Sequence, residues 1–273
     1  MTKDFLNISF ENAKQEQVAQ MRNELAPLNQ QLGTLVRSSD VIMLGEGNHF
    51  DIDAKKYSKL IIESVLTLVD RNPVIFLEAS DTTIMKHYDY VVRYCLEHGI
   101  PYHAVDTANI PIVGDPGLYP ERDVAIANNI KMVMKKNPGS VGIFIGGSNH
   151  CNKGGIHIRD LREQNKDYDY PSAASLLIQE LRIGSVALHF MHTNEMLAKR
   201  VDTSQEMLSL PGRYASIFIS QRFSSSGELH PERQLIRPES FDMIAFLPTI
   251  ERRILNILSG DPKKITYVDD EEN

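Results

Sequence analysis

Short apolar runs separated by segments of helical periodicity constrain the fold of this chain more than any other feature. Four such runs occur in the first 150 residues, at 41–45, 73–79, 101–106 and 141–147. Apolar residues recur with helical spacing around 54–70, 82–98 and 121–136. Strands that are covered by helices on both faces are apolar throughout, because neither face meets water. The order of the segments therefore predicts an α/β fold, a mixed, mostly parallel sheet with helices on both faces.

The N-terminal segment carries a different pattern. Between Val18 and Leu35 the apolar residues are separated by alternating steps of three and four, which places them on one stripe of a helix. Pro27 interrupts the stripe, so we expect a helix or a pair of helices that packs on the rest of the domain. Residues 1–39 are predicted to form this N-terminal helical segment.

After Cys151 the pattern loosens. A polar stretch covers 163–172, and a helix is expected around 173–182. Further apolar runs lie at 185–190, 213–220 and 241–247. Because the strands come closer together and the helices are fewer, we expect an antiparallel extension of the same sheet. No linker rich in Pro, Gly or Ser divides the chain, so we expect one domain over 40–260 and an acidic tail over 261–273.

Composition narrows the class of partner. The 29 basic and 36 acidic residues give a net charge of −7, and the basic residues are scattered. This pattern argues against a nucleic-acid or membrane partner and favours a small-molecule or peptide substrate. Cys95 and Cys151 form no Cys-x-x-Cys motif, which is typical of a reducing compartment. Residues 1–15 show no signal-peptide pattern and no apolar run reaches about 18 residues, so a cytoplasmic protein is expected, and export that needs no signal peptide stays open. A homo-oligomer is compatible with the sequence.

Polar side chains follow the four apolar runs. In an open α/β sheet, ligands bind outside the carboxyl ends of the strands, so these positions are candidates for a site. They carry Glu46, Asn48, His49, Glu78, Ser80, Asp81, Asp106, Ser148, Asn149 and His150. Ser80 or Asp81 is expected to cap the next helix. The remaining residues predict a cluster of carboxylates and histidines at one edge of the sheet, because helix caps do not require imidazoles.

The first of two similar turns, GEGNH at 45–49, has some features of a phosphate-binding loop. A dinucleotide fingerprint requires a third glycine where Phe50 stands, and it presents backbone N–H groups to an anion. The charge of Glu46 between the two glycines would oppose a pyrophosphate. The sequence therefore argues against a dinucleotide site.

The second turn, GGSNH at 146–150, leaves two covalent mechanisms open. It differs from the nucleophile elbow Gly-x-Ser-x-Gly in having His150 in place of the last glycine, so Ser148 is a candidate nucleophile. Cys151 is another, but adjacent residues in an extended segment point to opposite sides, so its base would have to be His49. A buried, unreactive Cys151 is the simpler interpretation.

Two further mechanisms fit the expected cluster better. In the first, a histidine held by a carboxylate takes a proton from water, which attacks an ester, amide or lactone carbonyl, and a second histidine or an arginine stabilises the oxyanion. In the second, the same side chains bind a divalent ion that polarises water, with three protein ligands and one open position. No His-Glu-x-x-His motif fixes a metal site, and zinc, manganese and iron are all compatible with these ligands.

Arg122 has two interpretations. It follows Pro120 in the first turn of the expected helix 121–136, where its acidic neighbours suit the helix dipole. Alternatively, its guanidinium reaches the carboxylate cluster, where it would hold Glu46 or Glu78 ionised or bind an anionic group of a substrate. The sequence does not decide between these interpretations.

The order and spacing of four motifs resemble the erythromycin esterase-like proteins and the wider superfamily that contains the ChaN haem-binding lipoproteins and the TraB and Tiki proteins. The motifs are Gly45-Glu46-Gly47-Asn48-His49, Glu78, Arg122-Asp123-Val124-Ala125-Ile126-Ala127-Asn128 and Gly147-Ser148-Asn149-His150. The segment 240–250 also resembles the last strand of the esterase-like domain. The resemblance implies a fold built from a duplicated β-α-β unit, in which the two histidine-bearing turns, 45–49 and 146–150, meet at one site.

The resemblance also implies roles for these residues. In the esterase members, a histidine of the first motif acts as general base without a metal. Carried over, His49 is the base, Glu46 and Glu78 orient it, and His150 and Arg122 complete the catalytic site. The substrate-binding residues are then expected to be Asn48, Asp106, Asp123, Ser148 and Asn149.

Two alternatives to a metal-free hydrolase follow from the same resemblance. A Tiki-type peptidase or hydrolase would bind a divalent metal, manganese or zinc, through His49, His150, Glu46 and Glu78. A non-catalytic member of the superfamily would bind haem or another protein on the same fold.

The chain departs from the esterase pattern just after the first motif. Phe50 stands where a small residue usually follows the histidine. Only Lys55 and Lys56 occur near the position where the esterases carry an arginine. A macrolide lactone is therefore not the expected substrate.

Overall fold

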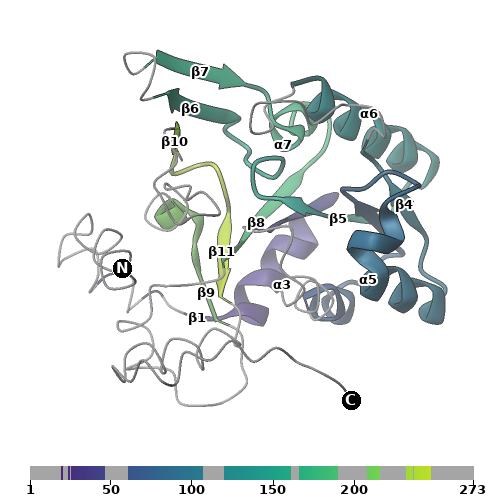
Figure 1. The fold of residues 1–273 in the computed structure, drawn as a ribbon. Helices are drawn as coiled ribbons and strands as arrows, with labels where there is room; N and C mark the ends of the chain where they lie inside the picture. Colours follow the sequence, from purple (N-terminus) through teal and green to yellow (C-terminus); the bar gives the residue numbers. More distant parts are fainter. Residues whose placement is uncertain are drawn as a thin grey trace, which may run out of the picture.

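The structure, a computed structural model, describes residues 20, 24, 26–46, 61–106, 120–160, 166–189, 208–215, 232–235 and 237–246. Its centre is a sheet with the strand order β1-β9-β11-β8-β2-β5-β3-β4 (Figure 1). These strands are β1 (Ala26–Pro27), β2 (Val41–Glu46), β3 (Pro73–Leu77), β4 (Tyr102–Ala104), β5 (Val141–Gly147), β8 (Ile183–His189), β9 (Leu208–Pro211) and β11 (Met243–Phe246). Neighbours from β11 to β4 run parallel, whereas β9 is antiparallel to β11 and to β1. The predicted mixed, mostly parallel sheet is confirmed.

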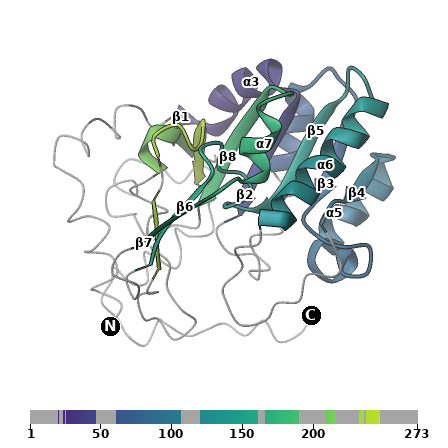
Figure 2. The same ribbon diagram turned by 90° about the horizontal axis from the view of Figure 1, so that it is seen from above.

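Helices cover both faces of this sheet, as predicted (Figure 2). One face is covered by α3 (Leu28–Ser38), α5 (Ile84–His98) and the helical residues 61–68, the other by α6 (Pro120–Lys136) and α7 (Ala173–Leu177). Alternate residues of β2 enter the two cores: Val41 and Met43 belong to the α6 side, Ile42 and Leu44 to the α3 side. All four are 0% exposed, which explains why the strand is apolar throughout. None of the helices in the described ranges is long and apolar enough to cross a bilayer.

The predicted repetition of strand, helix and strand is seen in β3-α5-β4 and again in β4-α6-β5. In each unit the two strands are parallel members of the same sheet. Such crossovers keep successive strands parallel. Because the strands run in the same direction, their carboxyl ends lie at one edge of the sheet. The expected helix at 54–70 is seen from residue 61 onward, since 47–60 lie outside the described residues.

The N-terminal segment packs on the sheet through α3. Leu28, Leu32 and Val36 are at most 1% exposed, which agrees with the predicted apolar stripe. The interruption near Pro27 is the two-residue strand β1, which pairs with β9 and is too short to leave a pattern in the sequence. Residues 1–19 and the tail 261–273 lie outside the described ranges, so the domain limits remain predictions.

The expected antiparallel extension is wrong for β8 and β11. Both join the sheet parallel to their neighbours, and only β9 and β1 are antiparallel. In sequence, β9 lies between β8 and β11, and in the sheet it lies on the outer side of β11. Because β9 runs antiparallel to β11, the chain reverses after β9 and β11 takes the same direction as β8. Closely spaced apolar runs therefore did not indicate hairpins here.

The expected strand at 213–220 is also wrong where the structure describes it. The strand β9 ends at Pro211, Gly212–Tyr214 form a 3₁₀ helix, and Ala215 is helical. Tyr214 and Ala215 are 5% and 0% exposed, so the apolar pattern reflects a buried helical turn. The helix expected over 173–182 ends at Leu177 and continues as a turn.

A second, three-stranded antiparallel sheet was not predicted. Its order is β10-β6-β7, with β6 (Ile156–Asp160), β7 (Lys166–Tyr170) and β10 (Glu232–Leu235). The strand β7 falls in the segment interpreted as a polar stretch. The sequence did carry a strand pattern here, since apolar or aromatic residues alternate with polar ones in both 156–160 and 166–170. In the sheet, Ile156 pairs with Tyr170 and Ile158 with Tyr168.

Candidate active site

The strands β2 and β5 end side by side, and each ends in one of the two similar turns. Glu46, the last residue of β2, pairs in register with Gly147, the last residue of β5. The Glu46 side chain is buried, and its backbone carbonyl accepts a hydrogen bond of 2.9 Å from the Ser148 N–H. The first residues of both motifs thus lie next to one another at the carboxyl edge of the sheet.

The glycines of the two motifs permit close approach rather than a turn conformation. A Cβ on Gly45 would lie 2.8 Å from the Ser148 Cα, and one on Gly146 would lie 2.6 Å from a Glu78 carboxylate oxygen. Neither is among the glycines with positive φ in the described ranges. Glycine is therefore needed here so that the turn and the Glu78 side chain can lie against the strands.

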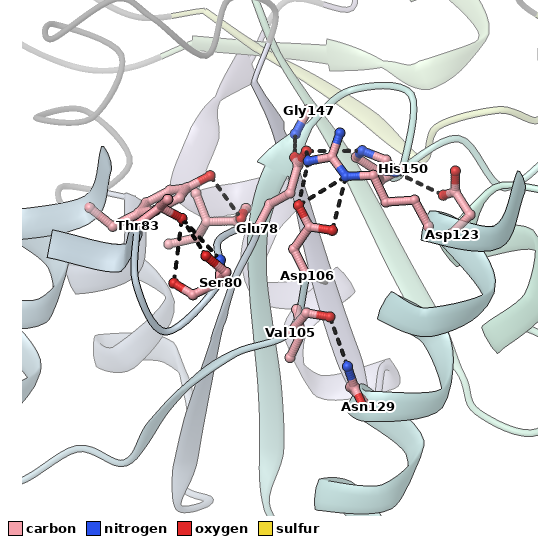
Figure 3. A network of polar contacts seen from close by, with 12 residues as sticks. Glu78, Ser80, Thr83, Val105, Asp106, Asp123, Asn129, Gly147 and His150 are labelled. Atoms are coloured by element: carbon pink, nitrogen blue, oxygen red, sulfur yellow. Dashed lines mark hydrogen bonds and ion pairs between the residues drawn. The ribbon is translucent and has the colours of Figure 1, made fainter. Parts of the chain in front are cut away.

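Glu78 lies at the centre of the polar network (Figure 3). It directly follows β3, where its N–H donates to the Ile145 carbonyl at 3.0 Å. One carboxylate oxygen accepts from the Gly147 N–H at 2.5 Å, and the other accepts from Arg122 Nη2 at 2.5 Å and His150 Nε2 at 3.0 Å. The side chain is 2% exposed. A buried carboxylate with these donors is held in one orientation.

His150 is fixed between two carboxylates. Its Nδ1 lies 2.8 Å from Asp123 Oδ1 and its Nε2 faces Glu78. Asp123 also accepts from the Ala173 N–H at 2.6 Å, and the Ala174 N–H donates to the His150 carbonyl at 2.9 Å. The start of α7 therefore holds both members of this pair.

The charge state of His150 follows from these contacts. Burial alone would lower the pKa of His150, but the charges of Glu78 and Asp123 and their hydrogen bonds outweigh it and raise the pKa from 6.5 to about 10. At neutral pH the ring is an imidazolium that donates from both nitrogens. It therefore has no lone pair with which to accept a proton or bind a metal.

Arg122 reaches the carboxylate cluster from the first turn of α6. Its Nε donates to both oxygens of Asp106 at 2.9 Å, and its Nη2 bridges Asp106 and Glu78 at 2.5 Å each. Burial would lower the pKa of Arg122, but the Asp106 hydrogen bond and the carboxylate charges raise it. The side chain is 29% exposed, and its Nη1 has no partner among the described residues.

The structure brings together five of the predicted site residues in one hydrogen-bonded chain: Asp106, Arg122, Glu78, His150 and Asp123. Glu46 lies at the neighbouring strand end. Ser148 and Asn149 are half-buried in the turn after β5. Asn48 and His49 lie outside the described residues, so the meeting of the two histidines remains a prediction.

Ser80 and Asp81 do not cap α5 as predicted. The helix begins at Ile84, its N-cap is Thr83, and no side chain makes the capping bond. Ser80 instead bonds to Thr82 and Thr83 at 2.9 Å each, because a three-residue turn separates it from the helix. These hydroxyls stabilise the turn that follows Glu78.

The thiol of Cys151 is a poor candidate nucleophile. It is 0% exposed, and burial, together with the charges of Glu78, Glu46 and Asp123, raises its pKa well above the ordinary value. A thiolate is the reactive form, so these surroundings suppress its reactivity. Burial also raises the pKa of Cys95, to about 11.

The described residues do not form a metal site. Among them, no group of three or more His, Cys, Asp or Glu side chains is arranged to hold a metal ion. A metal on His150 would have to displace Glu78 or Asp123 from its ring. His49, one of the four predicted ligands, lies outside the described residues, so the set of His49, His150, Glu46 and Glu78 stays a prediction.

Comparison with known proteins identifies the fold. No protein-family model and no curated protein sequence matches the chain. Among solved structures, it resembles a histidine-to-asparagine mutant of the erythromycin esterase EreC in its open conformation, with a TM-score of 0.58 and 10% identity over 80% of this chain and 93% of that one. RRSP, a MARTX toxin effector domain from Vibrio vulnificus, aligns with a TM-score of 0.37 and 16% identity over 58% of this chain and 39% of that domain. The chain thus has an erythromycin esterase-like fold.

Proposed function

We propose that this chain is a hydrolase that cleaves an ester, amide or lactone bond of a small molecule or peptide with an activated water. The observation that carries the proposal is Glu78, a buried carboxylate on which Arg122, His150 and the Gly147 N–H converge. It lies at the carboxyl edge of the parallel strands, where α/β proteins bind ligands. The likeness of the fold to an erythromycin esterase supports the same class of reaction.

The general base is His49 rather than His150. His150 is protonated and bonded at both nitrogens, so it cannot remove a proton from water. The remaining histidine of the two motifs is His49, which follows Glu46 by three positions. Glu46, at the end of β2, orients the base, and the role of His49 rests on the sequence because it lies outside the described residues.

Arg122 is the group that stabilises the oxyanion. Its Nη1 has no partner within the described ranges, and the side chain is partly exposed while its other nitrogens are anchored. A preorganised cation of this kind stabilises charge that develops on a carbonyl oxygen. Asp106 and Asp123 then serve to position Arg122 and His150 instead of contacting the substrate.

The reaction proceeds by addition and elimination. His49 takes a proton from water while the water oxygen bonds to the carbonyl carbon and the π electrons move to the carbonyl oxygen. The oxyanion then reforms the double bond and expels the leaving group. The leaving oxygen or nitrogen receives the proton from His49, which returns the base to its neutral form.

The experiment is turnover of a panel of 4-nitrophenyl esters, lactones and peptides by the native chain and by His49→Ala and Glu46→Gln. Loss of a general base lowers kcat by about 10²–10⁴-fold. The control is His98→Ala, an exposed histidine at the end of α5 that should leave kcat unchanged. If a substrate is turned over equally by His49→Ala, the assignment of the base is lost.

A further inference from the structure

The helix α5 is interrupted at Tyr88, beneath the site. The backbone there is not helical (φ −130°, ψ 25°), although α5 contains neither Pro nor Gly. Sharp kinks are usual at Pro and Gly, and neither residue explains this one. The Tyr88 side chain is 1% exposed and belongs to the same core as Val91 and Val92.

The hydroxyl of Tyr88 shares an acceptor with Glu78. It donates to the Ile145 carbonyl at 3.3 Å, and the same carbonyl accepts the Glu78 N–H at 3.0 Å. Burying a hydroxyl costs free energy that a hydrogen bond only offsets, and a phenylalanine would fill the apolar space equally well. Packing therefore accounts for the ring of Tyr88 but not for its hydroxyl.

The hydroxyl of Tyr88 lies close enough to the site to be affected by the charges of two of its carboxylates, Glu46 and Glu78. Burial first, and then the charges of Glu46 and Glu78, raise the pKa of Tyr88 well above its ordinary value. The phenol is therefore a neutral donor at every physiological pH. Two residues beyond Ile145 on the same strand, the Gly147 N–H binds the Glu78 carboxylate, so both ends of Glu78 are attached to β5.

We infer that Tyr88 is a positioning residue for Glu78. Through the Ile145 carbonyl, it fixes the backbone at Glu78 and thereby the carboxylate that binds His150 and Arg122. Its effect on turnover rests on the proposed hydrolase function, whereas its effect on the geometry of Glu78 does not. Misplacing the carboxylate that holds Arg122 and His150 is expected to lower kcat while leaving KM nearly unchanged.

The test compares Tyr88→Phe with Tyr90→Phe, an exposed tyrosine of the same helix. Amide and imidazole NMR signals of Gly147 and His150 report the two hydrogen bonds of Glu78 directly, without a substrate. In Tyr88→Phe we expect an upfield shift of both proton signals and exchange of the Gly147 amide that is faster by on the order of tenfold. In Tyr90→Phe both signals should match the native chain.

Each outcome decides the inference. Unchanged signals in folded Tyr88→Phe would overturn it, as would a Tyr88→Phe chain that does not fold, since the hydroxyl would then be needed for the whole fold. Shifted signals together with a lower kcat on an active ester support both the inference and the hydrolase proposal. Shifted signals in a chain that hydrolyses none of the panel support the positioning role and count against the hydrolase proposal alone.

Discussion

His150 and His157 are seven residues apart, and each is hydrogen-bonded to an aspartate, but their surroundings differ. His150 lies between Asp123 and Glu78, whose side chains are 4% and 2% exposed. His157, in β6, has one partner in Asp169, which is 72% exposed, and another in the Gly154 carbonyl at 2.7 Å. A hydrogen bond between a histidine and an aspartate therefore does not by itself determine the charge state of the histidine.

The number and burial of the carboxylates separate the two histidines. Two buried carboxylates hold His150 as an imidazolium, because neither charge is screened by water. An exposed carboxylate is screened, and a backbone carbonyl carries no net charge. The comparison predicts that perturbing the partners of His150 has large effects and that perturbing those of His157 has small ones.

The largest effect should come from Glu78→Gln. This change removes one charge from a buried group of ions and leaves His150 and Arg122 with one carboxylate fewer. Breaking a buried ion pair in this way costs about 3–5 kcal/mol of unfolding free energy. Urea unfolding of Glu78→Gln measures the cost. The matched control is Asp169→Asn, which should leave the urea midpoint close to that of the native chain; equal losses in both variants would contradict the comparison.

The pH dependence of stability tests the charge state of His150. Its pKa is raised from 6.5 to about 10 in the folded chain, so its contribution is fully present below pH 6.5 and is lost as pH rises toward 10. We expect the unfolding free energy to fall by on the order of a few kcal/mol between about pH 6.5 and 9.5. His150→Gln should abolish this slope and His157→Gln should keep it. If the unfolding free energy of His150→Gln still fell with pH over this range, the pH dependence would come from other titratable groups.

The meeting of Glu78 and His150 at one edge of the sheet could be predicted from the sequence, but the aspartates that hold His150 and Arg122 could not. Glu78 and His150 follow apolar strands, and parallel strands bring such positions to one edge. The choice of Asp123 for His150 and of Asp106 for Arg122 depends on how α6 lies against the strand ends. The sequence carries no periodic signal for that packing.

The parts of the fold that were missed have a common physical cause. Apolar runs covered on both faces identified β2, β3 and β5, whereas β7 has one polar face and few apolar residues. The direction of β8 and β11 depends on where β9 lies in the sheet, which short-range patterns do not encode. Sequence thus predicts buried elements better than the order and direction in which the later strands join the sheet.

Arg122→Lys should have an intermediate effect. Lysine keeps the charge but loses the planar fork that bridges Asp106 and Glu78, so we expect a loss of about 1–2 kcal/mol in unfolding free energy and a lower kcat on any active ester. Arg182→Lys is the control, because Arg182 makes a similar forked contact with Asp40 on the surface. Its urea midpoint should not change. A comparable loss in both variants would show that burial is not what separates the two arginines.

The smallest effect should come from removing metal ions. Both nitrogens of His150 are hydrogen-bonded to carboxylates, so this ring offers no lone pair to a metal. We expect dialysis against a chelator, followed by manganese or zinc, to change neither Tm nor turnover of an active ester. If activity were lost on chelation and restored by either ion, Glu78 would have to leave His150 in the active state. The imidazole NMR signal of His150 would then shift on metal addition while that of His157 stayed fixed, which would locate the ion and replace the metal-free mechanism.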